Sequence, residues 1–365
     1  MRFGNGLLHA PPRPIYAGVT ARPLNLVNAM FGRRLGGLEQ VFVDYSEALA
    51  LRGHAIVNLV SHGALAAAPL RALGQRVIEI GNFNQWDPLA IWRLRRALKG
   101  LRPDAVIAHG NRAINLARPA ASGLAPFVAV NHSINVKRTI GADFAIAIND
   151  DMRARLIAAG QPEARAPKLF NMVRRPQTLA TPAAPRDPPV IGAMGRFVAK
   201  KGFDVFLAAL GALKRQGRRF RAILAGAGDL EAPLKAQAAA LGLADVVNFP
   251  GWVHDKDAFF REIDLFVFPS SHDVCPVVLL EAFLWAKPVV LSDCPGPREI
   301  SCDGRDSLLF PIGDAAALAS RIARVLDEPG LAQRLGAAAQ AKILEEHTFE
   351  QAGARLEAIL REAAA

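Results

Sequence analysis

The sequence contains no apolar run long enough to cross a bilayer. Its clearest apolar stretches, such as Ala105–Ala108 and Leu265–Phe268, have the length of β-strands, whereas a membrane-spanning helix needs about 18 apolar residues. The opening stretch MRFGNGLLHAPPRPIY places prolines where a secretory signal would need an apolar core. We therefore expect a protein that is not exported and that remains in the cytoplasm.

Cysteine is also scarce. The three cysteines, Cys275, Cys294 and Cys302, are odd in number and lack the spacing of a zinc site. We expect free thiols in a reducing compartment.

Acidic residues are scarce in one half of the chain only. Residues 1–180 contain 23 Lys/Arg and 10 Asp/Glu, a net charge of +13, whereas residues 181–365 carry a net charge of −2 out of the total of +11. This asymmetry indicates that the N-terminal half meets something anionic. Nucleic acid and a phospholipid surface are both candidates. Since no helix-turn-helix, zinc-finger or RNA-binding signature accompanies the charge, we favour a membrane over nucleic acid.

Length and pattern predict two α/β domains. A chain of 365 residues is long for one hydrophobic core. Fully apolar strand-length runs alternate with helical stretches such as Pro88–Leu101, as in doubly wound parallel sheets. The proline-rich segment Arg174–Pro189 interrupts this alternation and then the alternation resumes. We expect an N-terminal domain over residues 1–175 and a C-terminal domain over 176–348. The predicted strands are Leu24–Met30, Ala55–Val60, Arg76–Ile80, Asp104–His109, Pro126–Asn131, Asp143–Ile148, Val190–Met194, Arg221–Ala225, Val246–Phe249, Leu265–Phe268 and Pro288–Leu291.

Two motifs in the C-terminal half carry chemistry. The first, Gly195–Asp204 (GRFVAKKGFD), follows the strand VIGAM and puts Arg196 and Lys201 beside the start of a helix, which suits an anion such as a diphosphate. Alternatively, these cations are only solvated residues of a loop. The second, Asp273–Phe283 (DVCPVVLLEAF), follows the strand LFVFP and opens a helix, with Pro276 suited to its first position.

The second motif offers three groups to a ligand. The backbone amides of Val277 and Val278 would point out of the helix start towards a phosphate or a sugar hydroxyl. Glu281 lies one turn further on, where its carboxylate could bind a ribose diol. A glutamate at this position could also simply cap the helix or pair with a neighbour.

Together these motifs resemble the retaining GT-B glycosyltransferases, in particular the large family four, which includes bacterial lipopolysaccharide and glycolipid enzymes. GRFVAKKG and DVCPVVLLEAF stand at the family's separation, and KPVVLSDCPGPREI is similar to its next strand and loop. Upstream, Gly36–Glu39 (GGLE) and the later Arg52-Gly53-His54 are similar to the family's G-G-x-E loop and R-G-H segment. The resemblance implies two Rossmann-like domains facing a cleft, with the last helix (about 349–365) returning to the N-terminal domain.

The resemblance also implies roles for individual residues. Arg196 and Lys201 would bind the donor diphosphate and stabilise it as the leaving group. Glu281 would hold the ribose hydroxyls, and Val253 would meet the base through its backbone. Gly37 would present an amide to the phosphate.

Two histidines of the N-terminal half and one carboxylate complete the implied site. His132 stands where the family often has a histidine that reaches the sugar, although a histidine at a strand end is commonly structural. His109, at the end of the preceding strand, would be structural or would face the acceptor. Asp273 replaces the family's usual glutamate and is one methylene shorter, which leaves the identity of the donor sugar open.

The implied reaction moves a hexose-type sugar from a nucleoside-diphosphate sugar to a lipid-linked, lipopolysaccharide or cell-surface glycan, with retained anomeric configuration and without a cofactor. No Asp-x-Asp strand end suggests a divalent metal site. A nucleotide-sugar epimerase and a non-catalytic sugar-nucleotide-binding protein remain alternatives. An epimerase would convert the donor when incubated with it alone, whereas a non-catalytic protein would only bind it.

The stretch Pro88–Leu101 predicts an amphipathic helix with a membrane-facing side. Asp87 suits the N-cap, and Ile91, Leu94, Leu98 and Leu101 form one apolar stripe that would pack on the sheet. The opposite side carries Trp92 amid four cations, which are Arg93, Arg95, Arg96 and Lys99. This arrangement suits the headgroup layer of an anionic membrane at its inner face, although a surface helix with an incidental tryptophan is the alternative.

Overall fold

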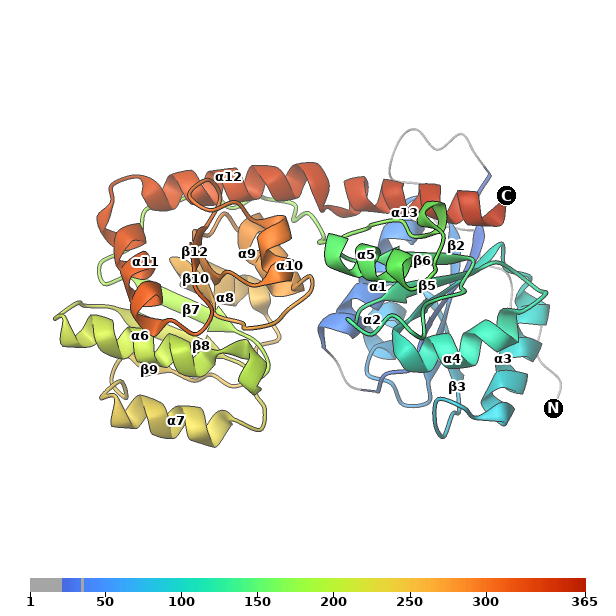
Figure 1. Cartoon of the computed structure of the whole chain (residues 1–365), viewed down its shortest axis with the longest axis horizontal. Helices are drawn as coiled ribbons and strands as arrows, with labels where there is room; N and C mark the ends of the chain where they lie inside the picture. The colour runs from blue at the N-terminus through green and yellow to red at the C-terminus, as the bar shows by residue number, and fades with distance from the viewer. Residues whose placement is uncertain (1–21, 34–35) are drawn as a thin grey trace. The chain divides into compact units, whose positions relative to one another are not determined.

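The protein is described by a computed structural model that places residues 22–33 and 36–365. The N-terminal segment for which we expect no export signal lies outside these residues. The chain forms two compact units (Figure 1). Unit 1 comprises the residues up to Met172 together with Phe349–Ala365, and unit 2 is Val173–Thr348. The division therefore falls a few residues before the boundary that we expected at 175/176.

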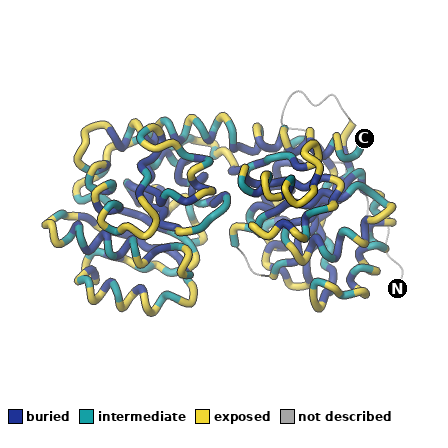
Figure 2. Tube along the Cα trace, viewed as in Figure 1, coloured by how far each residue is buried: buried dark blue, intermediate teal, exposed yellow. Residues whose placement is uncertain are grey.

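Unit 1 is built on a six-stranded parallel sheet with the order β3-β2-β1-β4-β5-β6. Its strands are β1 (Asn25–Met30), β2 (Ala55–Ser61), β3 (Arg76–Ile80), β4 (Ala105–His109), β5 (Phe127–Asn131) and β6 (Phe144–Ala147). Every residue of β4, β5 and β6 is buried, because helices cover both faces of a doubly wound sheet (Figure 2). β2 and β3 are added on one side of β1, whereas β4, β5 and β6 are added on its other side. The topological switch point therefore lies between β1 and β4.

The helices of unit 1 are α1 (Gly37–Leu51), α2 (Ala67–Ala72), α3 (Pro88–Leu101), α4 (Gly110–Ala121), α5 (Asp150–Ala158), the 3₁₀ turn η1 (Glu163–Arg165) and α13 (Phe349–Ala364). α3 and α4 pack together over one apolar layer, which contains Leu94 and Leu98, with Ile91 and Leu101 partly buried against it. Asp87 caps α3 as predicted, because its side chain accepts from the amides of Leu89 and Ala90.

The last helix, α13, packs on α1 and on the sheet of unit 1. Glu357 on α13 is buried and pairs with Arg52 at 2.5 Å, with Arg361 at 2.7 Å and with His54 at 3.6 Å. Burial tends to raise the pKa of Glu357, but the hydrogen bonds and charges of the two arginines outweigh this and lower it. The pair of Glu357 with Arg52 joins the C-terminal helix to this unit, and Arg361, on the same helix, supplies a second cation to the buried carboxylate.

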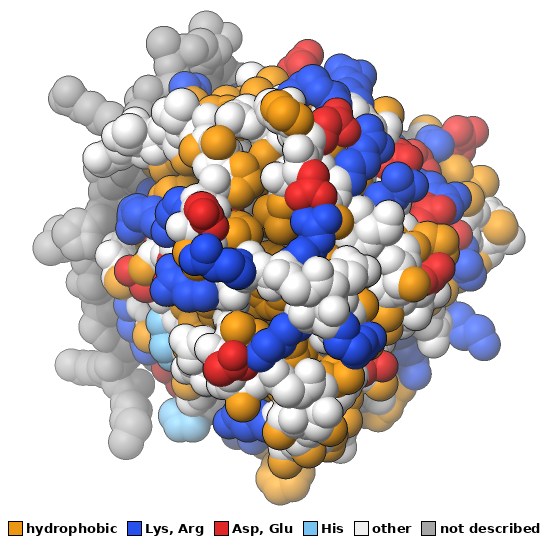
Figure 3. Space-filling view, turned by 90° about the vertical axis from the view of Figure 1, so that its left-hand side faces the viewer, with side chains coloured by type: hydrophobic (Ala, Val, Ile, Leu, Met, Phe, Trp, Pro, Cys, Tyr) orange, Lys and Arg blue, Asp and Glu red, His pale blue; other side chains and the backbone are white. Residues whose placement is uncertain are grey.

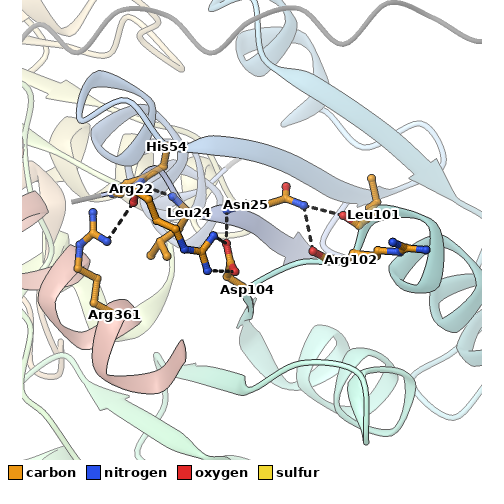
Figure 4. A network of polar contacts seen from close by, with 8 residues as sticks. All are labelled: Arg22, Leu24, Asn25, His54, Leu101, Arg102, Asp104 and Arg361. Atoms are coloured by element: carbon orange, nitrogen blue, oxygen red, sulfur yellow. Dashed lines mark hydrogen bonds and ion pairs between the residues drawn. The ribbon is translucent and has the colours of Figure 1, made fainter. Parts of the chain in front are cut away.

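Polar contacts also join the start of β1 to its neighbours (Figure 4). Asp104 accepts from the Asn25 amide at 2.7 Å and from the Arg22 guanidinium at 2.8 Å, while the Leu24 amide donates to His54 Nδ1 at 3.1 Å. Arg361 donates to the Arg22 carbonyl at 3.1 Å. These contacts set the register at the amino end of the sheet, away from the carboxyl ends that carry the predicted site residues.

Unit 2 repeats the same topology with the order β12-β11-β10-β7-β8-β9, again all parallel. The strands are β7 (Val190–Met194), β8 (Arg221–Ala225), β9 (Val247–Asn248), β10 (Leu265–Phe268), β11 (Val289–Ser292) and β12 (Leu308–Phe310). The predicted doubly wound architecture is confirmed for both units. β12 was not predicted, because it is only three residues long and its middle residue is half-buried.

The helical elements of unit 2 are η2 (Ala199–Lys201), α6 (Phe203–Arg215), α7 (Glu231–Ala240), α8 (Lys256–Glu262), α9 (Val277–Leu284), α10 (Pro295–Ile300), α11 (Ala315–Asp327) and α12 (Leu331–Glu346). Basic and acidic side chains mix on the face that carries α6, α7 and α11 (Figure 3). Ion pairs such as Arg218 with Asp327 at 2.6 Å fit the near-neutral charge of this half. The switch point of this sheet lies between β7 and β10, so the loops after these two strands meet at one place.

Candidate active site

The loop after β7 presents Arg196 to solvent. Its neighbour Phe197 is buried and anchors the turn, because its amide donates to the Ala227 carbonyl at 2.9 Å and its carbonyl accepts from the Leu230 amide at 3.1 Å. The Arg196 guanidinium is exposed and forms no hydrogen bond or ion pair within residues 22–33 and 36–365. A cation held on an anchored turn, with no protein partner, is available to an anionic ligand.

Lys201 lies at the end of the same loop, where a glycine brings the loops of β7 and β10 together. Gly202 has φ = 64°, and a Cβ there would lie 2.2 Å from the Pro269 carbonyl oxygen, so only glycine fits. This close approach places Lys201 Nζ 2.5 Å from Asp273 Oδ2 and 5.2 Å from the centre of the Phe268 ring. Lys201 and Asp273, 72 residues apart in sequence, thus meet at the switch point.

Asp273 is held by the loop that follows β10. The hydroxyl of buried Ser270 donates to Asp273 Oδ2 at 3.3 Å, and the Ser292 hydroxyl donates to the Ser270 carbonyl. Gly296 lies against the same segment, and a Cβ there would lie 2.4 Å from the Asp273 carbonyl and 2.2 Å from that of Val274. Ser270, Ser292 and Gly296 therefore position the carboxylate.

The start of α9 lies beyond Asp273 and offers free amides. Pro276 is the N-cap rather than the first helical residue as predicted, because its ψ of 115° is extended. Val277 and Val278 are then the first two helical residues, whose amides have no partner within an α-helix. The N-terminus of α9 carries the partial positive charge of a helix dipole, so these amides suit a phosphate or a sugar hydroxyl.

Glu281 lies one turn into α9, and one of its carboxylate oxygens forms an ion pair with a lysine. Its Oε1 is 2.6 Å from Nζ of Lys256, the first residue of α8. Its Oε2 is buried and lacks a hydrogen-bond partner in the described part of the chain. Burial raises the pKa of Glu281, an effect that the charge and hydrogen bond of Lys256 oppose. A buried carboxylate oxygen without a partner is an acceptor for a ligand hydroxyl.

Val253 lies in the loop between β9 and α8, directly before the helix that supplies Lys256. The loop is tied back to the sheet, because the Gly226 amide donates to the Gly251 carbonyl at 2.8 Å. Val253 is half-buried beside exposed Trp252. Val253 is thus three residues before Lys256, which pairs with Glu281.

In unit 1, Gly37 is the first residue of α1 and follows the N-cap Gly36. Among residues 22–33 and 36–365, no atom lies within 4 Å of the position that a Cβ would take on Gly37. The described part of the chain therefore gives no steric reason for glycine here. The amide of this first helical residue is available at the carboxyl edge of the unit 1 sheet.

His109 is the last residue of β4, His132 directly follows the neighbouring strand β5, and the structure brings their rings together. His109 Nδ1 lies 3.1 Å from His132 Nε2. His109 is fully buried, and His132 is half-buried. Burial lowers the pKa of His132 to about 3 and holds that of His109 well below its usual value, so both rings are neutral at pH 7.

The predicted exposure of the cationic side of α3 is confirmed in part. Trp92 is 56% exposed, the Arg96 guanidinium lies 5.7 Å from the centre of its ring, and Lys99 is exposed. Arg93 is exposed and donates to the Gly81 carbonyl. The placement of Arg95 on this side is wrong, because its guanidinium donates to the carbonyls at the C-terminal end of α4, at 3.1 Å and 2.7 Å.

Three exposed apolar side chains extend this surface towards the loop before α3. Phe83 is 94%, Trp86 54% and Leu89 52% exposed. The Arg138 guanidinium lies 4.4 Å from the centre of the Trp86 ring. Among the described residues, no helix is long and apolar enough to span a membrane. We call Phe83, Trp86, Leu89 and Trp92, with Arg93, Arg96 and Lys99, the α3 surface.

Comparison with known proteins decides the family. The family model for glycosyl transferases group 1 matches residues 175–342, and that for glycosyltransferase family 4 matches residues 35–166. The chain is a family four glycosyltransferase. The Rhizobium meliloti lipopolysaccharide core biosynthesis glycosyltransferase LpsD is 28% identical over 86% of this chain and 91% of its own length. The Mycobacterium leprae phosphatidyl-myo-inositol mannosyltransferase is 28% identical over 83% and 87%, respectively.

The GT-B fold of this glycosyltransferase is matched by solved structures. Anabaena HepE in complex with UDP-glucose superposes with a TM-score of 0.80 over 93% of this chain and all of that chain, at 20% identity. The apo form of the lipopolysaccharide outer core galactosyltransferase WaaB superposes with a TM-score of 0.74 over 92% of this chain and 99% of its own, at 17% identity.

Sequence reasoning missed the residues that support the predicted ones. Lys256 lies 25 residues before its partner Glu281, and no motif joins the two. Ser270 acts through a hydroxyl hydrogen bond to Asp273 within one loop, and Gly296 acts through its close approach to the Asp273 and Val274 carbonyls from another loop. Gly296 lies within the stretch KPVVLSDCPGPREI, and a glycine between two prolines was the one available signal of a close approach.

Proposed function

We propose that this glycosyltransferase moves a hexose from a nucleoside-diphosphate sugar to a lipid-linked or lipopolysaccharide-type glycan, with retained anomeric configuration. The observation that carries the proposal is the set of groups at the switch point of unit 2. Arg196 and Lys201 supply two cations, α9 supplies the amides of its first turn, and Glu281 supplies a carboxylate oxygen that has no partner among the described residues. The two phosphates of such a donor need cations and N–H donors, and the hydroxyl groups of its ribose and sugar need hydrogen-bond partners such as the amides and the carboxylate oxygen.

In the proposed complex, the diphosphate takes Arg196 and Lys201 as counterions. The amides of Val277 and Val278 donate to the phosphate or to a sugar hydroxyl, and the amide of Gly37 donates to the phosphate. Glu281 Oε2 accepts a hydrogen bond from the ribose, while Lys256 favours the charged form of the carboxylate. Val253 meets the base through its backbone.

The reaction breaks the bond between the sugar C1 and the phosphate oxygen and forms a bond from C1 to an acceptor hydroxyl oxygen on the same face. Negative charge develops on the departing diphosphate, and two preorganised cations with a helix N-terminus stabilise it. In this proposal these groups take the role that a divalent metal has elsewhere. The leaving phosphate oxygen accepts the proton of the acceptor hydroxyl, so no side-chain base is required.

Asp273 and His132 bind the transferred sugar in this proposal. Asp273 accepts from a sugar hydroxyl while it remains paired with Lys201, which couples sugar binding to the position of the phosphate ligand. His132 is a hydrogen-bonding partner on the side of unit 1. The shorter reach of aspartate selects which hydroxyl is bound, and thereby the donor sugar.

The α3 surface supports binding of unit 1 to the inner face of an anionic membrane. Trp92 and Phe83 would enter the headgroup layer, and Arg93, Arg96 and Lys99 would meet anionic lipid, each worth about 1 kcal/mol near the surface. The relatives that act in lipopolysaccharide and phosphatidylinositol glycosylation support an acceptor held at a membrane.

A donor screen followed by product analysis tests the proposal. The protein is mixed with a panel of nucleoside diphosphates and their sugars, and its thermal unfolding is recorded. A true donor at 100 times its dissociation constant should add about 2.7 kcal/mol to the unfolding free energy. The anomeric configuration of the product is then read by NMR. A product of inverted configuration, or conversion of the donor sugar to its epimer without acceptor, would contradict the proposal.

A further inference from the structure

The histidine pair of unit 1 can place its shared proton in two ways. Both rings are neutral, so each carries one ring proton, and the 3.1 Å contact between His109 Nδ1 and His132 Nε2 requires one donor and one acceptor. Either His109 Nδ1–H donates to His132, or His132 Nε2–H donates to His109. The choice decides what His132 offers to a substrate.

The surroundings of His109 distinguish the two arrangements. Its other nitrogen, Nε2, is buried and has no hydrogen-bond partner in the described part of the chain. The rings of Tyr45 and Phe42 lie edge-to-face against His109, with centroids at 4.8 Å and 5.8 Å. If His132 were the donor, His109 would carry its proton on Nε2, and a buried N–H would lack an acceptor. Buried N–H groups without a partner are rarer than under-satisfied acceptors.

The position of His109 in the chain adds a second constraint. His109 is the N-cap of α4, and its ring makes no bond to the amides of that helix. The positive end of the α4 dipole disfavours a doubly protonated imidazolium at this place. His109 is therefore a neutral, fully enclosed ring, and within the described ranges 22–33 and 36–365 its one hydrogen-bonding contact with another side chain is with His132.

We propose that His109 is a positioning residue that fixes His132 in the tautomer with its proton on Nδ1. His109 Nδ1–H donates to His132 Nε2, which leaves Nδ1–H of His132 as the group available at the carboxyl edge of the sheet. His132 is half-buried, and its Nδ1 has no partner among the residues that the structure describes. A second-nitrogen contact of this kind commonly sets the tautomer of a functional histidine.

The consequence for chemistry is specific. With its Nε2 lone pair occupied and its Nδ1 protonated, His132 donates one hydrogen bond and accepts no proton. It would therefore bind an oxygen of the sugar or phosphate and would not act as a general base, in agreement with proton transfer to the leaving phosphate. This inference about its ligand rests on the proposed function, whereas the proton positions do not.

The direct test is NMR spectroscopy of the full chain with ¹⁵N-labelled histidine at pH 7. The His132 signals are assigned as those lost in His132→Gln. We expect Nδ1 of His132 to give the resonance of a protonated ring nitrogen and Nε2 that of an unprotonated one. The opposite pattern in the wild-type protein would overturn the inference. This readout requires no substrate, so it decides the tautomer even if the proposed transferase reaction were not observed.

A matched pair of variants tests the positioning role. Asparagine at 109 keeps an N–H donor near the place of Nδ1, whereas glutamine moves the donor towards the place of Nε2. With the donor sugar found in the screen, we expect turnover by His109→Asn close to that of the wild type and turnover by His109→Gln about tenfold lower. The His132 tautomer should be kept in the first and lost in the second. Equal turnover and an unchanged His132 spectrum in both variants would overturn the role of His109.

Discussion

Lys201 and Asp273 form an ion pair of 2.5 Å between the loops that follow β7 and β10. Both side chains are largely covered, with 16% and 13% of their surfaces exposed. The group proposed to bind the diphosphate and the group proposed to bind the sugar are thus joined before any ligand arrives. A ligand anion must share Lys201 with Asp273, so a change at Asp273 acts on the surroundings of the diphosphate as well as on the sugar.

Asp273→Asn is expected to separate nucleotide binding from transfer. Removal of the carboxylate charge frees Lys201, so the nucleoside diphosphate from the screen should bind as tightly as to the wild type or up to about fivefold tighter. Sugar transfer should fall at least about tenfold, because the sugar loses a charged acceptor. Calorimetry and initial rates measure the two effects. Asp293→Asn, which removes an exposed ion pair with Arg298, is the control. Weaker nucleotide binding by Asp273→Asn would contradict this account.

Gly37→Ala is expected to weaken donor binding, whereas Gly202→Ala is expected to lower the stability of the fold. The methyl group at 37 meets no atom of the residues that the structure describes, so thermal stability should stay within about 0.5 kcal/mol of the wild type. Donor binding should weaken, because the methyl reaches the phosphate. At 202 the methyl group meets the Pro269 carbonyl at a positive φ, and stability should fall by about 1–3 kcal/mol. Unchanged donor affinity in Gly37→Ala would remove Gly37 from the site.

Much of this site could be predicted, because parallel strands and their loops leave local signals. The spacing in GRFVAKKG and in DVCPVVLLEAF locates two loops after apolar strands, and the doubly wound topology then brings those loops together. Contacts between loops far apart in sequence could not be predicted. The pairing of Lys201 with Asp273, of Lys256 with Glu281 and of His109 with His132 depends on strand order, to which no single motif refers.

Helix surfaces showed the same limit. Periodicity placed the buried stripe of α3 correctly, since Leu94 and Leu98 are fully covered. Periodicity also assigned Arg95 to the solvent-exposed side of α3, which was wrong. A helical wheel cannot show that the neighbouring helix α4 ends within hydrogen-bonding distance of that guanidinium. The direction taken by a long side chain near the edge of an apolar stripe is set by its tertiary contacts.

Unit 1 should lose stability as the pH falls from 7 to 5. Burial lowers the pKa of His54, His109 and His132, so the unfolded chain takes up protons from about pH 6.5 downwards while the folded chain does not. Their stabilising contribution is full above pH 6.5 and is lost as the pH falls towards their folded pKa values. Each histidine adds a slope of up to about 1.4 kcal/mol per pH unit. Denaturant unfolding at several pH values measures it, and His109→Asn should show a smaller slope. A pH-independent stability over this range would contradict the burial of these rings.

Vesicle flotation tests the α3 surface. Wild-type protein should float with anionic vesicles at low salt and less so at high salt, because salt screens charge attraction. Trp92→Ala and the double variant Arg93→Glu/Arg96→Glu should both bind more weakly, the double variant by at least tenfold. Trp252→Ala and Arg215→Glu/Arg219→Glu alter exposed residues of unit 2 and are the matched controls. Equal flotation of all five proteins would contradict membrane binding through the α3 surface.

The most direct test of the central claim is the rate of nucleoside-diphosphate release from donor and acceptor by the wild type and by Arg196→Ala. Arg196 is exposed and has no partner in the part of the chain that the structure describes, so its truncation should leave the fold and the unfolding temperature unchanged. If its charge stabilises the departing diphosphate, the rate should fall by about 100-fold or more, as for other groups that stabilise charge only in the transition state. Turnover by Arg196→Ala at the wild-type rate would contradict the assignment of the leaving-group site.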